Sequence, residues 1–185
     1  AYYDPGLKEA RHARLEAFPN YTGIRGDLCD HALLQRMFEE HRITDVIHLA
    51  AQAGVRYSLT HPFVYTKSNV DGFVALLEAM RHAGLKRVLY ASSSSVYGGN
   101  TKLPFSEDDP VDHPVSLYAA TKRADELIAH TYTSLYGIQT IGLRFFTVYG
   151  PWGRPDMAMW IFTDKIRRGE KIQVYHYGRM QQDFK

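Results

Sequence analysis

Two segments in the middle of the chain have the residue types needed to oxidise an alcohol. The first is a run of four serines at 92–95 that follows the apolar segment 88–91. The second places a tyrosine and a lysine four residues apart, at Tyr118 and Lys122. If that segment is helical, both side chains lie on one face, and the ammonium favours a phenolate over a phenol. Such a phenolate can take a proton from a hydroxyl group near neutral pH, while serine hydroxyls hydrogen-bond the reacting oxygen.

The spacing of Tyr118 and Lys122 alone is weak evidence, because it occurs by chance on many helices. The simpler alternatives are a pair on a helix surface and, for the serines, a strand-end turn capped by hydroxyls. The nine histidines are not spaced as metal ligands, and the only cysteine is Cys29. We therefore expect no metal site.

Composition gives no sign of a nucleic-acid or membrane partner. The 185 residues are 45% hydrophobic and 23% charged, with a net charge of +2, which is ordinary for one soluble domain. No apolar run approaches the roughly 18 residues of a transmembrane helix. Because Cys29 has no partner for an internal disulfide, the composition fits a reducing compartment. We expect a cytoplasmic protein.

Apolar runs alternate with segments of helical periodicity, which predicts an α/β fold with a parallel sheet covered on both faces. Asp30 and Ser116 are expected to cap helices. The polar segment 98–114 is expected to be a loop, and 171–175 to be extended. Helices are expected over 7–17, 30–41, 63–82, 116–136 and 157–168, and strands over 21–28, 45–51, 86–92 and 138–145.

Four blocks of sequence strengthen the chemical interpretation when they are taken together and in order. They are HLAAQAGVRYS at 48–58, YASSSSVYG at 90–98, VDHPVSLYAATK at 111–122 and LRFFTVYGPWGRPDM at 143–157. With them the chain resembles the extended short-chain dehydrogenase/reductase family, the NAD-dependent epimerases and dehydratases, and most closely the UDP-glucuronate 4-epimerases. The resemblance covers nearly all of the chain and implies a Rossmann-type doubly wound parallel sheet.

The resemblance implies roles for individual residues in catalysis and in binding NAD. Tyr118 would be the acid/base, Lys122 would tune it and hold the nicotinamide ribose, and Ser93 would be the catalytic serine. A helix cap is the simpler role for Asp27, a buried strand for 49–52, and a structural amide for Asn69. The expected cofactor-binding residues are Asp27, Leu28, Leu49, Ala50, Ala51, Gln52, Asn69, Tyr118 and Lys122.

Substrate contacts are implied for a second set, in which guanidinium groups suit a diphosphate or a carboxylate. An ordinary surface ion pair is the alternative for the arginines, and a core position is the alternative for Phe145. His48 is expected to be a strand histidine satisfied by backbone, and His113 a loop residue. The expected substrate-binding residues are Arg56, Ser94, Ser95, Phe145, Thr147 and Arg154.

The expected reaction is C4 epimerisation of a UDP-sugar, UDP-glucuronate to UDP-galacturonate, through a 4-keto intermediate with NAD⁺. Ser94 and Ser95 favour it, because related dehydratases place Asp and Glu there and related decarboxylases place Glu at the second position. UDP-glucose or UDP-N-acetylglucosamine epimerisation, UDP-glucuronate decarboxylation and a non-catalytic role remain alternatives. The family also suggests a homodimer paired through helices 63–82 and 117–136, and a role in polysaccharide biosynthesis.

The family's glycine-rich turn is absent from this sequence, which contains no G-x-x-G-x-x-G. We therefore expect an internal piece of a longer enzyme that lacks the first βαβ unit and the C-terminal substrate lobe. Residues 1–150 would be a partial dinucleotide-binding domain, and 151–185 the start of the sugar-nucleotide region. Alone, this piece should be inactive and should not retain NAD. Gln182 and Lys185 stand where the family usually has Arg and Thr, so no nucleotide contact is assigned to them.

Overall fold

A computed structural model describes residues 3–174 of the chain. They divide into two compact units, one formed by residues 26–145 and the other by the described residues before 26 and after 145. The predicted domain boundary at residue 150 stays a prediction.

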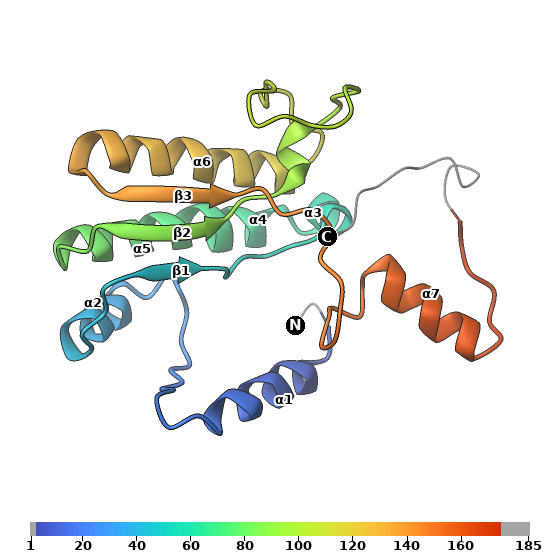
Figure 1. Cartoon of the computed structure of the whole chain (residues 1–185), viewed down its shortest axis with the longest axis horizontal. Helices are drawn as coiled ribbons and strands as arrows, with labels where there is room; N and C mark the ends of the chain where they lie inside the picture. Colours follow the sequence, from blue (N-terminus) through green and yellow to red (C-terminus); the bar gives the residue numbers. More distant parts are fainter. Residues whose placement is uncertain (1–2, 175–185) are drawn as a thin grey trace. The chain divides into compact units, whose positions relative to one another are not determined.

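The unit of residues 26–145 is built on a parallel sheet of three strands in the order β1-β2-β3 (Figure 1). Leu89 in the central strand stands opposite Ile47 on one side and Ile141 on the other. Because all three strands are parallel, the segments that follow them leave from the same edge of the sheet. The strands are β1 Val46–His48, β2 Arg87–Ala91 and β3 Gln139–Leu143.

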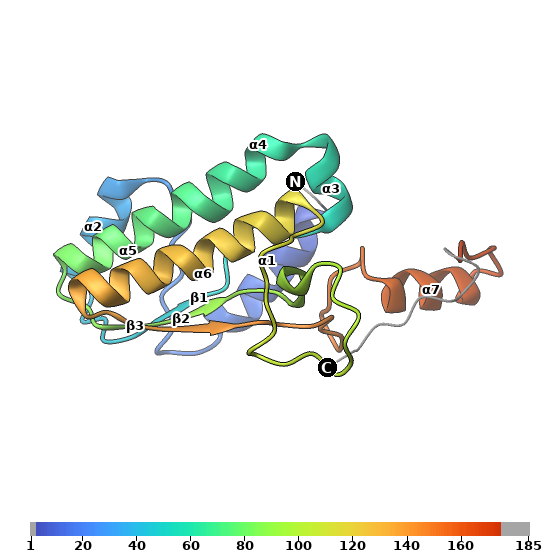
Figure 2. The same cartoon turned by 90° about the horizontal axis from the view of Figure 1, so that it is seen from above.

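Helices α5 (Gly72–His82) and α6 (Leu117–Tyr136) lie side by side on one face of this sheet (Figure 2). Val88 and Tyr90 alternate along β2 and point into this layer, as expected for period-two strands. The core is completed by fully buried side chains of α5 and by residues of α2 (His31–Glu40), and its members include Leu34, Phe73, Leu77, Met80, Ala129 and Ile138.

The predicted helix 63–82 exists, but its backbone changes type along its length. It consists of α4 (Pro62–Tyr65), a π-helical turn (Thr66–Asp71) and α5. A short helix that the sequence did not predict, α3 (Val55–Thr60), precedes it. π-Helical turns are rare and often mark functional sites. Asn69 lies in this one.

The other unit contains α1 (Pro5–Glu16) and α7 (Ala158–Arg167). Arg11 donates a hydrogen bond to the Trp152 carbonyl, and the guanidinium of Arg14 stacks over the Trp152 ring at 4.8 Å. These contacts connect the two separate stretches of sequence that make up this unit.

The predicted helices and three of the four predicted strands are confirmed, with shifts of a few residues at their ends. The strand predicted at 21–28 is wrong: these residues are irregular. A strand needs a partner for its backbone groups, and in the described part of the chain β1 pairs with β2 alone. Residues 171–174, predicted to be extended, lie in no helix or strand, and Tyr175 lies outside the described residues.

Candidate active site

The serine run begins where β2 ends and continues its pairing. Ser92 N donates to the Leu143 carbonyl and Ser94 N to the Phe145 carbonyl, each at 2.8 Å. Ser93 then caps a 3₁₀ helix (Ser94–Tyr97), and its Oγ accepts a hydrogen bond from Ser95 N at 3.2 Å. The hydroxyl therefore performs the capping role of the simpler interpretation. It remains able to donate its own proton to another oxygen.

Tyr118 and Lys122 lie in the first two turns of α6, as predicted. Ser116 caps this helix by accepting a hydrogen bond from Ala119 N at 3.1 Å. Tyr118 is half-buried, with its ring edge-on to the Tyr65 ring at 6.1 Å. Because the Lys122 side chain is only 2% exposed, the helix-surface alternative is wrong for this residue. The 3₁₀ helix that follows Ser93 packs against α6, so the serine turn and the helix of the Tyr-Lys pair are neighbours.

Lys122 is paired with a carboxylate that sequence reasoning did not single out. Its Nζ lies 2.9 Å from Asp125 Oδ2, and the Asp125 side chain is 1% exposed. Burial raises the pKa of Asp125 to about 6, although the neighbouring Lys122 ammonium opposes that rise. A signal existed in the sequence, since Lys122 and Asp125 are three residues apart on a predicted helix.

His48 faces the same buried layer from β1. Its ring stacks on Phe73, with centroids 5.3 Å apart. Burial, followed by the charge of Lys122, lowers the pKa of His48 to about 4, so the ring is neutral near pH 7. The expectation that backbone satisfies this histidine is wrong for Nε2, which is buried and has no hydrogen-bond partner among the described residues. His113 is an exposed loop residue, as predicted.

Asn69 fastens the loop after β1 to the helix of the Tyr-Lys pair. Its Oδ1 accepts from Gln52 N at 2.8 Å, and its Nδ2 donates to the Gln52 carbonyl at 3.1 Å and to Thr121 Oγ1 at 2.9 Å. Thr121 in turn donates to the Tyr118 carbonyl at 2.9 Å. The buried amide is thus satisfied within the chain. This is the structural role that the sequence left open, and two hydrogen bonds, through Thr121, connect Asn69 to Tyr118.

Two of the predicted cofactor-binding residues, Asp27 and Leu28, lie before α2. Asp27 accepts a hydrogen bond from Cys29 N at 2.9 Å and lies 3.3 Å from Lys67 Nζ. The hydrogen bond from Cys29 and the nearby Lys67 both hold the pKa of this exposed carboxyl below its usual range. Asp30, not Asp27, caps α2 by accepting from Leu33 N, so the helix-cap alternative is wrong for Asp27. Leu28 packs against the core.

The residues that follow β1 form an open edge. Leu49, Ala50 and Ala51 are exposed, and β1 ends before them at His48. The buried-strand alternative for this segment is therefore wrong. The small side chains of Ala50 and Ala51 at this strand end allow a flat ligand to approach the backbone closely.

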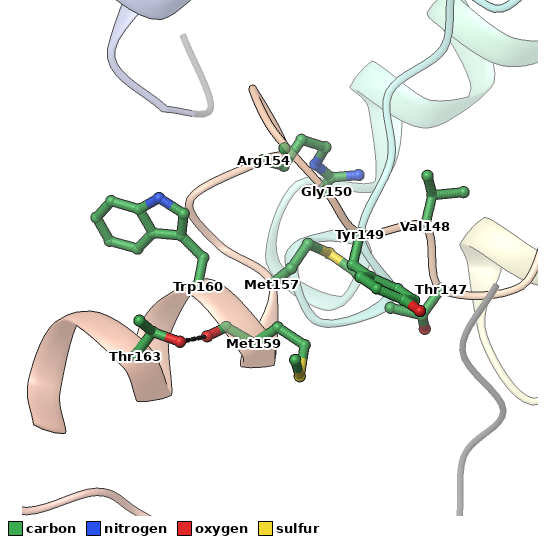
Figure 3. Close-up of a pocket in the computed structure, with 10 residues that line it drawn as sticks. Thr147, Val148, Tyr149, Gly150, Arg154, Met157, Met159, Trp160 and Thr163 are labelled. Carbon is green, nitrogen blue, oxygen red and sulfur yellow. Dashed lines mark hydrogen bonds between the residues drawn. The ribbon is translucent and has the colours of Figure 1, made fainter.

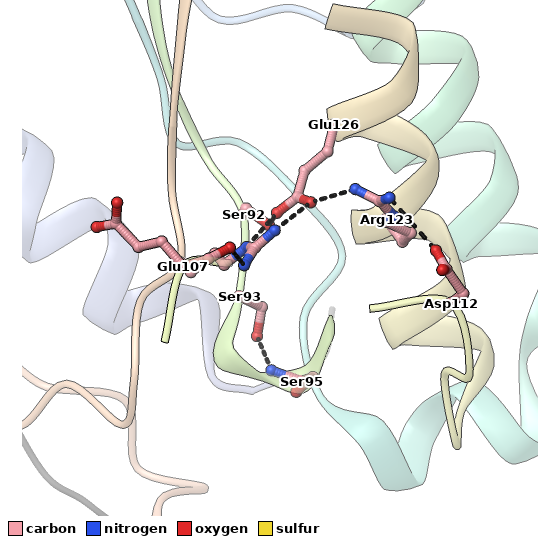
Figure 4. Close-up of polar contacts among 8 residues, drawn as sticks. Ser92, Ser93, Ser95, Glu107, Asp112, Arg123 and Glu126 are labelled. Atoms are coloured by element: carbon pink, nitrogen blue, oxygen red, sulfur yellow. Dashed lines mark hydrogen bonds and ion pairs between the residues drawn. The ribbon is translucent and has the colours of Figure 1, made fainter. Parts of the chain in front are cut away.

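A polar network centred on Glu126 holds the serine turn, and sequence reasoning missed it (Figure 4). Glu126 accepts from Ser92 Oγ at 2.6 Å and from Arg123 Nη1 at 3.0 Å. Arg144, just after β3, donates to both of its carboxylate oxygens, at 2.9 and 3.1 Å. Burial alone would raise the pKa of Glu126, but hydrogen bonds from Arg144 and Ser92 lower it overall. The contacts of Glu126 with Ser92 and Arg144 connect residues far apart in sequence, so no local pattern could have indicated them. Only the pair of Arg123 and Glu126, three residues apart on the predicted helix, had a local signal.

Two predicted substrate residues, Thr147 and Arg154, line one pocket of about 220 Å³ in the other unit (Figure 3). Arg154 lies against Asp156, with Nε 3.0 Å from Oδ1. The carboxylate orients the guanidinium plane, and it also fits the surface ion-pair alternative. The pocket wall is mainly apolar or aromatic and includes Val148, Tyr149, Met157, Met159 and Trp160.

The remaining substrate candidates belong to the unit of residues 26–145. Arg56 is exposed on α3, and Ser94 and Ser95 are half-buried at the start of the 3₁₀ helix. Phe145 is 41% exposed, so the core alternative is wrong for this residue. Gln182 and Lys185 lie outside the described residues.

The residues present fit part of a dinucleotide. The exposed Asp27 carboxylate can accept from an adenine amine, and the open strand end at 49–51 can lie along the ligand. The Lys122 ammonium, in contrast, is buried beside Asp125. Within residues 3–174 no group of three acidic, histidine or cysteine side chains is arranged to hold a metal ion. None of the helices described there is both long and apolar enough to cross a membrane.

Comparison with known proteins also points to NAD-dependent epimerases and dehydratases. UDP-glucuronate 4-epimerase 3 of Arabidopsis thaliana is 54% identical over 99% of this chain and 43% of that protein. The crystal structure of a UDP-glucuronic acid 4-epimerase from Bacillus cereus, in complex with UDP-glucuronic acid and NAD, matches with a TM-score of 0.89 and 34% identity, over 97% of this chain and 56% of that one. A dTDP-glucose 4,6-dehydratase from Streptomyces venezuelae, with NAD bound, matches with a TM-score of 0.88 and 30% identity, over 95% and 54%.

The chain spans about half the length of the curated relatives it matches, from 38% to 56%. The model of the NAD dependent epimerase/dehydratase family matches residues 4–185. With the serine turn beside the helix of Tyr118 and Lys122, and with this match along almost its whole length, the chain belongs to the NAD dependent epimerase/dehydratase family.

Proposed function

We propose that this chain belongs to an enzyme that inverts C4 of a UDP-sugar. The observation that supports this most directly is the packing of the serine turn against the helix that holds Tyr118 and the buried Lys122. When NAD⁺ is bound, it supplies the hydride acceptor and donor. Tyr118 removes the proton of the C4 hydroxyl and later returns one, while Lys122 favours its phenolate form. Ser93 donates a hydrogen bond to the same oxygen.

UDP-glucuronate is the proposed substrate, with UDP-galacturonate as the product. Two curated or solved relatives with this activity in their names support the choice. Thr147 and Arg154 are proposed to contact the sugar nucleotide, because Arg154 presents a guanidinium oriented by Asp156 in a pocket wall. Ser94 and Ser95 are proposed to donate hydrogen bonds to the sugar carboxylate. Neither can act as the carboxylic acid that elimination of water needs.

The test is product analysis with the complete protein that contains this chain, purified and supplied with UDP-glucuronate and NAD⁺. Formation of UDP-galacturonate without release of carbon dioxide and without net NADH supports the proposal. Release of carbon dioxide indicates the decarboxylase, and a 4-keto-6-deoxy sugar made from a UDP- or dTDP-hexose indicates a dehydratase. The same assay with UDP-glucose and UDP-N-acetylglucosamine identifies the preferred sugar.

A homodimer is the proposed state of the complete enzyme. On α6, Leu127 and Leu135 are 55% and 66% exposed and lie two turns apart, on the same side of the helix. Phe63 on α4 is 84% exposed. Large apolar side chains exposed on helices often lie in interfaces between subunits. Replacing Leu127 and Leu135 together by Glu should convert a dimer to a monomer in light scattering.

A further inference from the structure

Lys122 lies inside the layer between helix and sheet, where an ammonium group needs a negative partner. Its side chain is 2% exposed and the Asp125 side chain 1%, with Nζ and Oδ2 2.9 Å apart. Burial disfavours a charged group unless an opposite charge lies beside it. The other carboxylate oxygen, Asp125 Oδ1, is buried and has no hydrogen-bond partner among the described residues. Among the described residues, the Asp125 carboxylate therefore relies on Lys122 for its interaction with a polar group, and the Lys122 ammonium relies on Asp125 for its negative partner.

The other titratable groups around this pair cannot take the place of Asp125. His48, on β1, is neutral near pH 7, because burial and the charge of Lys122 lower its pKa to about 4. Tyr90, on β2, is a neutral phenol, because burial and then the charges of Glu126 and Asp125 raise its pKa to about 12. Glu126, the next residue on α6, already accepts from two arginines and a serine.

We propose that Asp125 is a positioning residue that holds the Lys122 ammonium in place, so that Lys122 can favour the phenolate of Tyr118. The inference rests on the proposed function, in which Tyr118 is the base. Asp125 contacts neither reacting atom in this account and acts through Lys122 alone.

A pH dependence follows from this arrangement. Burial raises the pKa of Asp125 to about 6, against the opposing effect of Lys122, so mild acid protonates the carboxyl and removes the charge that faces the ammonium. Activity that depends on Asp125 should fall as the pH drops through about 6.

The first test measures kcat/KM of the complete enzyme from pH 5 to pH 9 for the wild type, Asp125→Asn and Asp125→Glu. We expect Asp125→Asn to lose about tenfold or more at pH 8, mainly in kcat, and to lack the decline near pH 6. Asp125→Glu should recover part of the loss, because the charge is retained. The matched control is Asp45→Asn, which makes the same charge change in the exposed pair with Arg87. This pair lies where strands β1 and β2 begin. Wild-type activity and pH profile in Asp125→Asn, or an equal loss in Asp45→Asn, would overturn the inference.

A second test does not depend on activity, so it separates failure of the inference from failure of the proposed function. The unfolding midpoints of Lys122→Met, Asp125→Asn and the double variant form a cycle. We expect the loss in the double variant to be clearly smaller than the sum of the two single losses, because removing both charges leaves none unpaired. Additive losses would overturn the inference. If the wild type proves to have no epimerase activity, the proposed function fails while this cycle still decides whether Asp125 and Lys122 are coupled.

Discussion

Arg144 and Glu126 form a two-point ion pair directly behind the serine turn. Nε lies 2.9 Å from Oε1 and Nη2 lies 3.1 Å from Oε2. The same Oε1 accepts from Ser92 Oγ at 2.6 Å, so one carboxylate joins β2, β3 and α6 at the edge where the strands end. These contacts fix the position of Ser92, the residue before Ser93, relative to α6, the helix that holds Tyr118.

Replacing Glu126 by Gln should destabilise the protein and misplace the serine turn. The amide keeps the shape but removes the charge that two arginines face, and losing charge-assisted hydrogen bonds at this half-buried site should cost about 2 kcal/mol. Urea unfolding should show this loss, and kcat should fall with little change in KM. Glu39→Gln is the matched control, since Glu39 is exposed and accepts a hydrogen bond from the exposed Gln35. Equal stability of the two variants would contradict the role of Glu126.

Gly98 should tolerate no side chain, whereas its neighbour Gly99 should. Gly98 has φ +59°, and a Cβ there would lie 2.2 Å from the backbone carbonyl oxygen of His113. Gly99 has open space around the same position. We expect Gly98→Ala to lose about 1–3 kcal/mol of stability and Gly99→Ala to stay within about 0.5 kcal/mol of wild type. Similar melting temperatures for the two variants would show that Gly98 does not lie against the His113 carbonyl as described.

Removing the side-chain amide of Asn69 should make the first turns of α6, which contain Tyr118, open more often. Asn69→Ala leaves the buried polar groups of Gln52 and Thr121 without this partner, at about 1–3 kcal/mol for each unsatisfied group. The exposed Asn20 provides the control variant Asn20→Ala. Hydrogen exchange should become faster in the first turns of α6 in Asn69→Ala alone. Unchanged exchange there would contradict the link from Asn69 through Thr121 to Tyr118.

His48 and Asp125 should have opposite effects on stability between pH 4 and pH 6.5. The folded state disfavours protonated His48, whose pKa is about 4, so unfolding binds a proton and stability falls as the pH drops below 6.5. Folded Asp125, with a pKa of about 6, keeps a proton that the unfolded chain loses near 3.8, so its contribution falls as the pH rises to 6. Each effect is worth about 3 kcal/mol.

The two contributions should nearly cancel in the wild type, and single variants should separate them. In Asp125→Asn, stability should rise with pH from about 4 to 6.5, while in His48→Leu it should fall from about 4 to 6. Denaturant titrations at a series of pH values measure both slopes. Two variants with the same slope would show that these groups do not titrate as described.

Local patterns were enough to predict most of the elements and the main candidate residues. Asp30 and Ser116 cap their helices as predicted, because capping depends on residues three positions apart. The failed strand at 21–28 shows the limit: strand formation depends on a partner, which local sequence does not specify. Arg144 and Glu126, and Asn69 and Gln52, are far apart in sequence, so only the fold could bring them together.

The roles of Asp27, Arg56 and Thr147 stay predictions, because they concern contacts with ligands. The exposed fractions of two side chains nevertheless exclude a core role for them. Leu49 and Phe145 could be read from sequence as core residues, yet both are largely exposed, at 63% and 41%. Apolar residue type predicts burial only on average, and exposed apolar residues at the end of a strand are where ligands of this fold bind.

The central claim is that Tyr118 is the base that takes the C4 proton of a UDP-sugar, and its most direct test is kcat for UDP-glucuronate in Tyr118→Phe of the complete enzyme. The change removes one oxygen and keeps the ring that packs against Tyr65. We predict that kcat falls by about 10²- to 10⁴-fold, with unchanged folding and unchanged affinity for NAD⁺. A variant that still converts UDP-glucuronate within a few-fold of the wild-type rate would contradict the mechanism.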